Sequence, residues 1–168
     1  TFSKAFAHDA LNRPTSATMP DLSELRPTYN EAGLLEAVDA RLRGATDANG
    51  APVWTAFVTA IAYDEKGRRT RIDYGNGTFT EYFYDALSFR LTRLRTTRSS
   101  DAKRLQDLFY FYDPVGNITT IRDDAHPEVF FAGQQVTPTQ EFEYDALYRL
   151  ISATGREHAG GVGDVQRD

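Results

Sequence analysis

Apolar and aromatic residues occur along this chain in short runs, which are broken at brief intervals by Asp, Asn, Gly and Pro. The clearest runs are TFTEYFY from Thr78 to Tyr84, LTRLRTT from Leu91 to Thr97, DLFYFY from Asp107 to Tyr112 and EFEY from Glu141 to Tyr144. Aromatic and β-branched side chains pack well on a pleated surface. The pattern therefore predicts many short strands and an all-β fold.

The breaks between the runs repeat one motif, an aromatic residue followed by Asp or Asn. Copies begin at His8, Tyr29, Tyr63, Tyr84, Tyr112 and Tyr144. Each strand is expected to end on the aromatic residue, and the following side chain is expected to start a turn by accepting a backbone N–H two residues on. The intervals vary from 21 to 34 residues, which is more than a rigid solenoid allows. The motif predicts antiparallel hairpin repeats.

The position four residues after the aromatic is expected to need a positive φ. It holds Gly33, Gly67, Gly116 and Asn12 in four of the copies. In the copy that starts at Tyr84 it is Ser88, and the extra residue Phe89 predicts a loop that is one residue longer. Tyr148 occupies the position in the last copy and is an exception to the pattern.

Other segments carry turn and loop signals. Asn76-Gly77 predicts a tight hairpin turn with positive φ at both residues, and the stretches 19–25 and 47–52 also predict turns or loops. Apolar residues between Leu34 and Leu42 could fit a helix, but the repeat makes this stretch the outgoing strand of a hairpin.

Two regions fall outside the repeat. Residues 123–140 are expected to form an inserted loop with a short strand at 129–131. Residues 155–168 are Gly-rich and polar, and they are expected to be a flexible tail or a cut connection. Residues 1–154 then form the repeat segment.

Composition and charge exclude several classes of protein for this chain. A formal net charge of −5 argues against nucleic-acid binding, and the lack of cysteine excludes disulfides and thiolate sites. No apolar run approaches the ~18 residues of a membrane span. The first residues have neither an initiator Met nor a signal-peptide pattern, as expected for a segment of a larger protein.

The repeated turn resembles the YD repeat of RHS proteins, and YDEKGRRTRI, starting at Tyr63, matches that repeat almost residue for residue. The strings HDALNRPTSATMPD, FRLTRLRTTR and YDPVGNITTIRDD are similar to the RHS shell region of bacterial insecticidal toxin complexes, in the B and C components and their SpvB-like relatives. The resemblance covers nearly the whole chain.

The resemblance implies a strip of an extended, curved sheet that forms part of a hollow shell enclosing a toxic C-terminal polypeptide in a secreted bacterial protein. The chain lacks the propeller, the self-cleaving core and the effector domain of a complete family member. Neighbouring RHS segments of the same or a partner chain are the implied partners. Because a strip leaves sheet edges open, the isolated segment is expected to self-associate.

Several motifs could carry chemistry, but each has a simpler structural interpretation. Asp113-Pro114 could be a self-cleavage site, yet it occupies the ordinary turn position. The stretch from Asp123 to His126 offers metal ligands without a defined motif. His8, His126 and His158 lie outside any recognisable nucleophile context. We therefore assign no catalytic residue, no cofactor and no metal ligand, and we expect a protein that is not an enzyme.

Two surface features leave a binding function open. The cationic stretch from Arg90 to Arg98, with Lys103 and Arg104, could line a cargo or anion site, or it could be a solvated face with cross-strand partners such as Glu81 or Asp107. Exposed tyrosines could stack on sugar rings, namely Tyr82, Tyr84, Tyr110, Tyr112 and Tyr144. The alternative to a shell segment is thus a carbohydrate- or protein-binding β module acting in cell-surface recognition.

Overall fold

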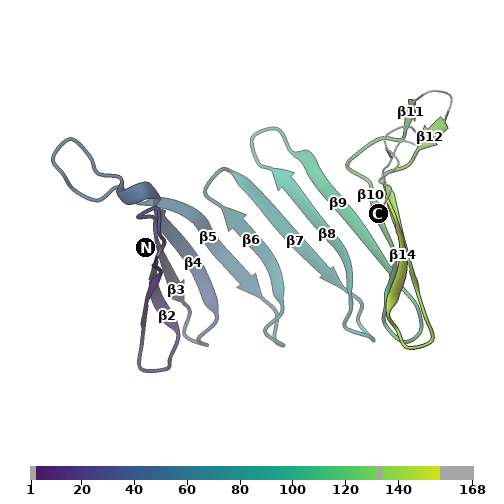
Figure 1. Ribbon diagram of the computed structural model, residues 1–168, viewed down its shortest axis with the longest axis horizontal. Coiled ribbons are helices and arrows are strands. Elements are labelled where there is room, and N and C mark those ends of the chain that lie inside the picture. The colour runs from purple at the N-terminus through teal and green to yellow at the C-terminus, as the bar shows by residue number, and fades with distance from the viewer. Residues whose placement is uncertain (1–2, 132–133, 156–168) are drawn as a thin grey trace, which may run out of the picture. The chain divides into compact units, whose positions relative to one another are not determined.

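The computed structural model describes residues 3–131 and 134–155. Within these residues twelve strands form one sheet, and their order in the sheet follows their order in the chain (Figure 1). The first seven are β1 (Ala5–His8), β2 (Pro14–Thr18), β3 (Glu24–Tyr29), β4 (Leu35–Arg41), β5 (Thr55–Tyr63), β6 (Arg69–Tyr74) and β7 (Thr78–Tyr84). The others are β8 (Leu91–Arg98), β9 (Lys103–Tyr112), β10 (Ile118–Asp123), β13 (Thr139–Tyr144) and β14 (Leu150–Thr154). The predicted all-β fold of antiparallel hairpin repeats is confirmed.

The chain divides into two compact units. One contains residues 1–81 and 98–101, and the other contains residues 82–97 and 102–168. In both units the aromatic-Asp turns join an odd-numbered strand to the strand that follows it, with β13 and β14 as the last pair. Because successive connections of an antiparallel meander alternate between the two ends of the strands, the turns of each unit lie along the same rim of the sheet.

The strand bounds agree with the sequence pattern where the repeat is regular. β7 spans the predicted run Thr78–Tyr84, and β4 confirms that the stretch after Leu34 is a strand. A short 3-10 turn, η1 (Leu42–Gly44), follows β4. The insertion contains more structure than expected, because β11 (Val129–Phe131) pairs with a second strand, β12 (Gln134–Val136). Residues 156–168 of the expected tail lie outside the described residues.

The prediction for the Asn76-Gly77 turn was wrong in detail. Only Gly77 takes a positive φ, 77°. The side-chain oxygen of Asn76 accepts hydrogen bonds from the backbone N–H and the hydroxyl of Thr78, at 3.1 and 2.7 Å. This local Asx turn replaces the type I′ turn that needs positive φ twice.

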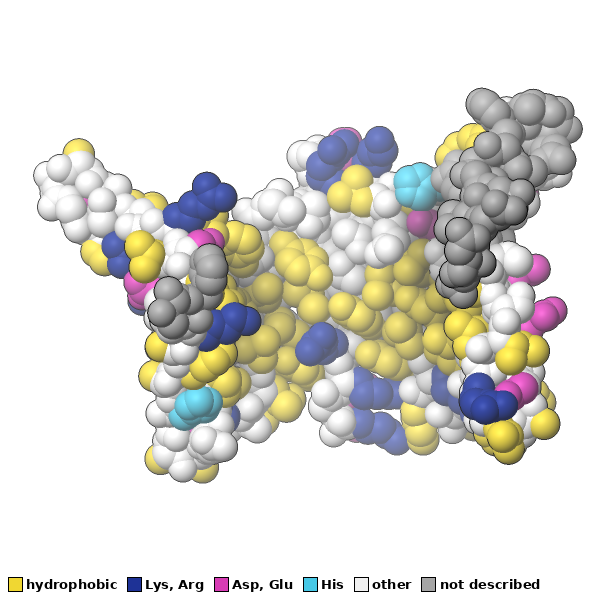
Figure 2. Space-filling model, viewed as in Figure 1, with side chains coloured by type: hydrophobic (Ala, Val, Ile, Leu, Met, Phe, Trp, Pro, Cys, Tyr) yellow, Lys and Arg dark blue, Asp and Glu magenta, His cyan; other side chains and the backbone are white. Residues whose placement is uncertain are grey.

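The core is thin, as expected for a single layer of strands. Buried apolar side chains in the described residues are Ala17, Ala40 and Ile72. Figure 2 shows apolar side chains gathered over the strands on the visible face. Much of the stability must therefore come from strand pairing and from contacts between neighbouring repeats. No helix in the described part has the length and hydrophobicity to cross a membrane.

Candidate functional site: the aromatic-Asp turns

The turn at Asp64 shows the full hydrogen-bond arrangement of the repeat. The Asp64 N–H donates to the carbonyl of Arg68 at 2.9 Å, and the Gly67 N–H donates to the carbonyl of Asp64 at 3.0 Å. The Asp64 carboxylate accepts the backbone N–H groups of Lys66 and Arg68, both at 2.9 Å, and the Arg68 Nε at 2.7 Å. The side chain therefore closes the turn from inside, as the sequence predicted.

The turns at Asp9 and Asp145 repeat this arrangement bond for bond, with Arg13 and Arg149 as the closing arginines. Asn30 uses its amide oxygen to accept the N–H of Leu34 at 2.9 Å. The Asp85 carboxylate accepts the N–H groups of residues 87 and 88 in its longer loop. A carboxylate is thus useful but not essential for the turn.

Positive φ falls where the repeat predicts it. The values are 59° at Asn12, 76° at Gly33, 73° at Gly67, 111° at Gly116 and 61° at Tyr148. In the longer loop the extra residue Phe89 takes the positive φ, 60°. Tyr148 donates its N–H to the carbonyl of Asp145 at 2.9 Å, as the glycines do in their turns. The turn hydrogen bonds hold Tyr148 in a conformation that its own side chain disfavours.

One further turn has the same geometry without the aromatic residue. The Asp47 N–H donates to the carbonyl of Ala51 at 2.9 Å, and the Asp47 carboxylate accepts the N–H groups of Asn49 and Ala51 at 2.8 and 2.9 Å. The turn predicted for residues 47–52 is thus confirmed, and Asp47 and Gly50 have the same three-residue spacing as the Asp and the positive-φ residue of the repeat.

Hydrogen bonds from the backbone lower the pKa of several turn carboxyls. The N–H of Arg13 is the main cause at Asp9, the N–H of Ser88 at Asp85, and the N–H of Arg149 at Asp145. At Asp64 and Asp113 desolvation works in the opposite direction, but the hydrogen bonds prevail and the pKa is again lowered. These carboxylates therefore stabilise the turns in their charged form.

Four of the tyrosines that precede these turns also bind the preceding repeat. The hydroxyl of each donates to the carbonyl of the first residue of that repeat's outgoing strand. The pairs are Tyr29 to Pro14 at 2.9 Å, Tyr63 to Leu35 at 2.6 Å, Tyr112 to Leu91 at 2.7 Å and Tyr144 to Ile118 at 2.9 Å. We call these four hydrogen bonds the tyrosine staples. Each joins two successive hairpins inside one unit.

Arginine side chains also contact the rings of two of these tyrosines. The guanidinium carbon of Arg13 lies 4.6 Å from the ring centre of Tyr29, and that of Arg90 lies 5.5 Å from the ring centre of Tyr112. The arginine that follows one turn therefore covers the tyrosine of the next. The recurrence of Arg just after the positive-φ position was the signal in the sequence for this contact.

The suspected cleavage motif has the geometry of an ordinary turn. The Asp113 carboxylate accepts the N–H groups of Gly116 and Asn117 at 2.6 and 2.8 Å, and its second oxygen accepts the Asn117 amide at 2.8 Å. The Asp113 N–H donates to the carbonyl of Asn117 at 3.0 Å. The groups of this motif are thus engaged in closing a turn.

The Asp123-Asp124 pair lies where the repeat gives way to the insertion, and both carboxylates have structural partners. Asp123 accepts the N–H of Asp107 at 2.9 Å and that of Ala125 at 3.0 Å. Asp124 binds Arg122 at 2.7 Å. The Nε2 of His126 lies 3.7 Å from the Asp123 carboxylate. In the described ranges no three His, Cys, Asp or Glu side chains gather as metal ligands would.

Of the other two histidines, only His8 lies among the described residues. His8 ends β1, and its ring centre lies 6.5 Å from that of Phe6. His158 lies outside the described residues.

The cationic stretch surrounds a fully buried carboxylate. Asp107 is 0% exposed, and Arg93 binds it through two hydrogen bonds of 2.6 and 2.7 Å. Arg104 adds a contact of 3.2 Å. The hydrogen bonds from Arg93 are the main cause that lowers the pKa of Asp107. The predicted cross-strand partnership with Asp107 is confirmed.

Arginine and phenylalanine alternate beside this cluster, across four strands. The guanidinium carbon of Arg93 lies 5.6 Å from the ring centre of Phe83 and 4.6 Å from that of Phe109. Arg122 lies 5.1 Å from the Phe109 ring on the far side. The cations of this face are therefore already occupied by rings and carboxylates.

The prediction of exposed tyrosines was wrong. All five are half-buried, and the hydroxyls of Tyr112 and Tyr144 form staples. Burial raises the pKa of Tyr110 and of Tyr112. The residues lean on their cross-strand neighbours because a single-layer sheet has few other apolar surfaces to cover them.

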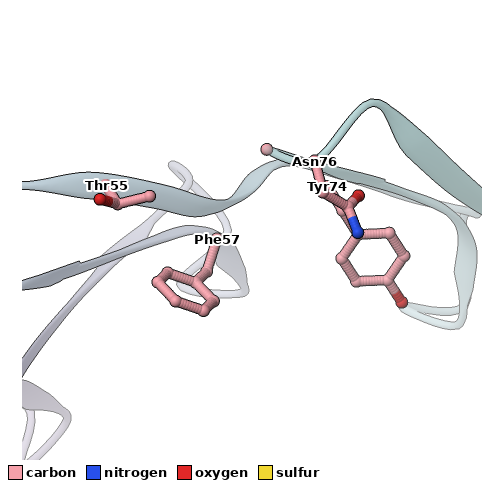
Figure 3. Close-up of a pocket in the computed structure, with 5 residues that line it drawn as sticks. Thr55, Phe57, Tyr74 and Asn76 are labelled. Atoms are coloured by element: carbon pink, nitrogen blue, oxygen red, sulfur yellow. The ribbon is translucent and has the colours of Figure 1, made fainter. Parts of the chain in front are cut away.

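A shallow pocket of about 340 Å³ opens between the ends of β5 and β6. Figure 3 shows the rings of Phe57 and Tyr74 on the same side of these strands, with Thr55 and Asn76 beside them. A Cβ at Gly75 would lie 1.7 Å from the carbonyl oxygen of Ala56. The two strands can approach here only because residue 75 is glycine.

The chain is similar to two curated toxin subunits of Yersinia entomophaga. It is 37% identical to toxin subunit YenC2 over 142 residues, which are 82% of this chain and 14% of YenC2. It is 38% identical to toxin subunit YenC1 over 138 residues, which are 80% of this chain and 13% of YenC1. No family model matches the chain.

Solved toxin structures contain the same fold. The Tc holotoxin pore of Photorhabdus luminescens matches 92% of this chain at 36% identity with a TM-score of 0.70, and the TcdB2–TccC3 crystal structure matches 92% at 36% identity with a TM-score of 0.71. This chain covers 7% of each matched chain. The repeated turns, the sheet and these similarities agree: the chain is an RHS/YD-repeat segment that resembles the shell region of bacterial insecticidal toxin complex proteins.

Proposed function

We propose that this chain is a structural, non-catalytic strip of a toxin shell wall, which keeps an enclosed toxic C-terminal polypeptide away from solvent. The observation that carries the proposal is the set of tyrosine staples. In the described turns, Tyr112 and Tyr144 bind the preceding repeat in one unit, and Tyr29 and Tyr63 do so in the other. Such contacts extend a wall one hairpin at a time, because each repeat needs only its neighbour.

The use of the polar side chains supports a structural role. Asp113 closes a turn, Asp123 caps two backbone N–H groups, and the buried Asp107 neutralises Arg93. A catalytic carboxylate needs free access to a substrate, whereas these three are engaged in the fold. The wall itself would then supply enclosure, and any toxic chemistry would reside elsewhere.

The ends of the strip suggest its partners. β1 and β14 are the terminal strands in the sheet order, and terminal strands offer unpaired backbone groups to a further strand. We propose that neighbouring RHS strands, of the same or a partner chain, pair with them, and that the isolated segment can self-associate at these edges. The similarity to toxin subunits also favours an extracellular site of action.

A graft into TcdB2–TccC3 tests the wall function. This segment would replace the stretch that it matches, and limited proteolysis would follow the hypervariable C-terminal region of TccC3. We expect the region to be degraded no faster in the graft than in the parent complex, measured side by side. Rapid degradation, at the rate of the same region expressed alone, would contradict the proposal. A correctly assembled complex of unchanged mass is the required control.

One feature favours the alternative of a carbohydrate-binding module. The pocket beside Phe57 and Tyr74 places two aromatic rings on one side of the sheet, and aromatic rings can stack on sugar rings. Binding on a glycan array that is lost in Phe57→Ala would support this alternative. An array without binding would set it aside.

A further inference from the structure

The tyrosine staples share one acceptor position, and the last hairpin of the described chain repeats that position. Ile118, for example, begins β10, pairs with Tyr112 across its own hairpin and accepts the hydroxyl of Tyr144 from the next hairpin. Leu150 has the same place in the last hairpin, because it begins β14 and pairs with Tyr144. The Leu150 carbonyl therefore lies where the next staple of the series would end.

The arginine that precedes Leu150 matches an arginine that already contacts a tyrosine ring. Arg149 and Arg13 each donate Nε to the carboxylate of their own turn at 2.7 Å. The ring of Tyr29 lies 4.6 Å from the Arg13 guanidinium carbon, and the Arg13 side chain is 31% exposed. The Arg149 side chain is 73% exposed. Arg149 thus offers to solvent the contact that Arg13 makes with a ring.

The outer side of β14 has the backbone groups that a further strand needs. β14 is the last strand in the sheet order of the described residues, with β13 on its inner side. Leu150 is 54% exposed, whereas Leu91 and Ile118, which hold the same place in their hairpins, are half-buried. We call the Arg149 guanidinium, the Leu150 carbonyl and the outer edge of β14 the tyrosine socket.

The sequence indicates where a tyrosine for the socket comes from. In the four staples the tyrosine follows its acceptor by 15 to 28 residues. No tyrosine follows Leu150 in the 168-residue sequence, and the chain spans 14% of YenC2. A tyrosine for the socket must therefore come from a further repeat outside these residues.

We propose that the tyrosine socket binds a strand that runs antiparallel to β14 and ends in a tyrosine followed by Asp or Asn. The hydroxyl of that tyrosine donates to the Leu150 carbonyl, and its ring packs on Arg149. The proposal rests on the wall function, since it names the strand that continues the wall at β14. It goes beyond edge pairing, because unpaired backbone groups accept any strand, whereas the socket selects one that ends in tyrosine.

Existing strand pairs give the register of the bound strand. In β2–β3 and in β10–β13, the residue three places after the acceptor lies opposite the residue four places before the tyrosine. These pairs are Ala17 with Leu25 and Ile121 with Gln140. Ala153 holds that place in β14, so it should lie opposite the fourth residue before the bound tyrosine. Cα atoms of opposite residues lie within about 5.5 Å, which is close enough for a disulfide.

A cysteine pair tests the socket in the full chain, which has no cysteine of its own. The chain carries Ala153→Cys, and the probe is a synthetic peptide that copies residues 139–154 with Gln140→Cys. Mass spectrometry measures the mixed disulfide of chain and peptide at equilibrium in a glutathione buffer. We expect Tyr144→Phe in the peptide to lower the equilibrium constant of linking about fivefold, because one hydrogen bond is lost.

Two chain variants test the register and the arginine. Ile151→Cys in place of Ala153→Cys moves the thiol two residues along the same face of β14, and it should link to the same peptide at least about tenfold less, because diagonal neighbours lie too far apart. Arg149→Asn, added to Ala153→Cys, copies Asn117 in another turn. It should lower linking about two- to fivefold, because the ring loses its cation. Circular dichroism checks that both variants keep the fold.

A second copy of this chain is a different occupant, because its incoming edge strand β1 ends in His8 instead of tyrosine. Its fourth residue before the aromatic is Lys4. A mixture of Ala153→Cys and Lys4→Cys chains should therefore link at least about fivefold less than Ala153→Cys chain and peptide at equal concentrations. Equal or better linking of the two chains would contradict the choice of a tyrosine strand as occupant.

Three other results would overturn the tyrosine socket. They are equal linking of the Tyr144 and Tyr144→Phe peptides, equal linking at Ile151→Cys and Ala153→Cys, and linking no better than that of a scrambled peptide with one cysteine. The protease test of the graft does not depend on any of these results. Failure of the socket and failure of the wall function are therefore distinguishable.

Discussion

The hydroxyl of Tyr112 donates a 2.7 Å hydrogen bond to the carbonyl of Leu91, the first residue of β8. Tyr112 ends β9 and opens the next aromatic-Asp turn, so this bond joins one hairpin to the one before it. Tyr112 therefore precedes a turn and also links its own hairpin to the preceding hairpin by a hydrogen bond.

Removal of this hydroxyl should weaken the fold measurably. We expect Tyr112→Phe to lower the free energy of unfolding by about 1 kcal/mol, because the half-buried Leu91 carbonyl loses its partner. Urea denaturation followed by circular dichroism would measure the change. Tyr148→Phe is the control, since Tyr148 is exposed, and it should change stability by less than about 0.5 kcal/mol. Equal effects of the two substitutions would argue against the staple.

A second prediction concerns the close approach of β5 and β6. Gly75→Ala should cost several kcal/mol or prevent folding, because the new Cβ would lie 1.7 Å from the carbonyl oxygen of Ala56. Gly50→Ala meets no atom within 4 Å and carries only the cost of a positive φ, about 1–2 kcal/mol. Thermal unfolding of the two variants would compare them. A Gly75→Ala protein as stable as Gly50→Ala would show that the strands can separate here.

The buried Asp107 should contribute far more to the free energy of unfolding than an exposed acid in a similar ion pair. Asp107→Asn leaves the Arg93 guanidinium without its bidentate partner. We expect this substitution to lower the free energy of unfolding by about 3 kcal/mol. Asp101→Asn breaks the exposed pair with Arg98 and should cost less than about 1 kcal/mol. Chemical denaturation at neutral pH separates the two cases. A small effect at Asp107 would mean that solvent reaches the cluster.

The turn carboxylates make the stability of the fold depend on pH in the acid range. Because the folded-state pKa of Asp9, Asp85 and Asp145 is lowered, their contribution is complete above the unfolded pKa of about 3.9 and is lost as the pH falls through the folded pKa values. Asp145→Asn should retain the turn, as Asn30 does naturally, and should flatten the loss of stability below about pH 4.

Urea unfolding at pH 7 and pH 3 measures this difference. The wild type should lose more stability than Asp145→Asn between these two pH values. Identical losses would mean that the Asp145 carboxylate does not contribute through its charge.

The turns could be predicted from the sequence because their causes are local. An Asp or Asn side chain and a positive-φ residue three positions later lie within one turn, so spacing alone was sufficient for Gly33, Gly67 and Gly116. Tyr148 was an exception by residue type, yet it takes φ 61°. Its hydrogen bond to Asp145 and the Arg149 closure hold it there, and these override the preference of a single residue.

Cross-strand contacts could not be predicted in the same way. The staple from Tyr144 to Ile118 depends on the pairing of β10 with β13. The sequence does not show that these two strands pair, because the insertion separates them. The cap that Asp123 provides to Asp107 has the same origin, since it depends on the register of β9 and β10. The tyrosines were expected to be exposed because the sequence does not reveal which neighbour covers each ring.

A structure of the TcdB2–TccC3 complex with this segment in place of its matched stretch is the sharpest test of the wall function. We expect β1 and β14 to pair with the flanking strands of the TcdB2–TccC3 shell, and the hydroxyls of Tyr112 and Tyr144 to donate to the carbonyls of Leu91 and Ile118 as they do here. A segment that folds as a separate body outside the wall, with the shell closed or broken behind it, would contradict the claim that this chain is part of a shell wall.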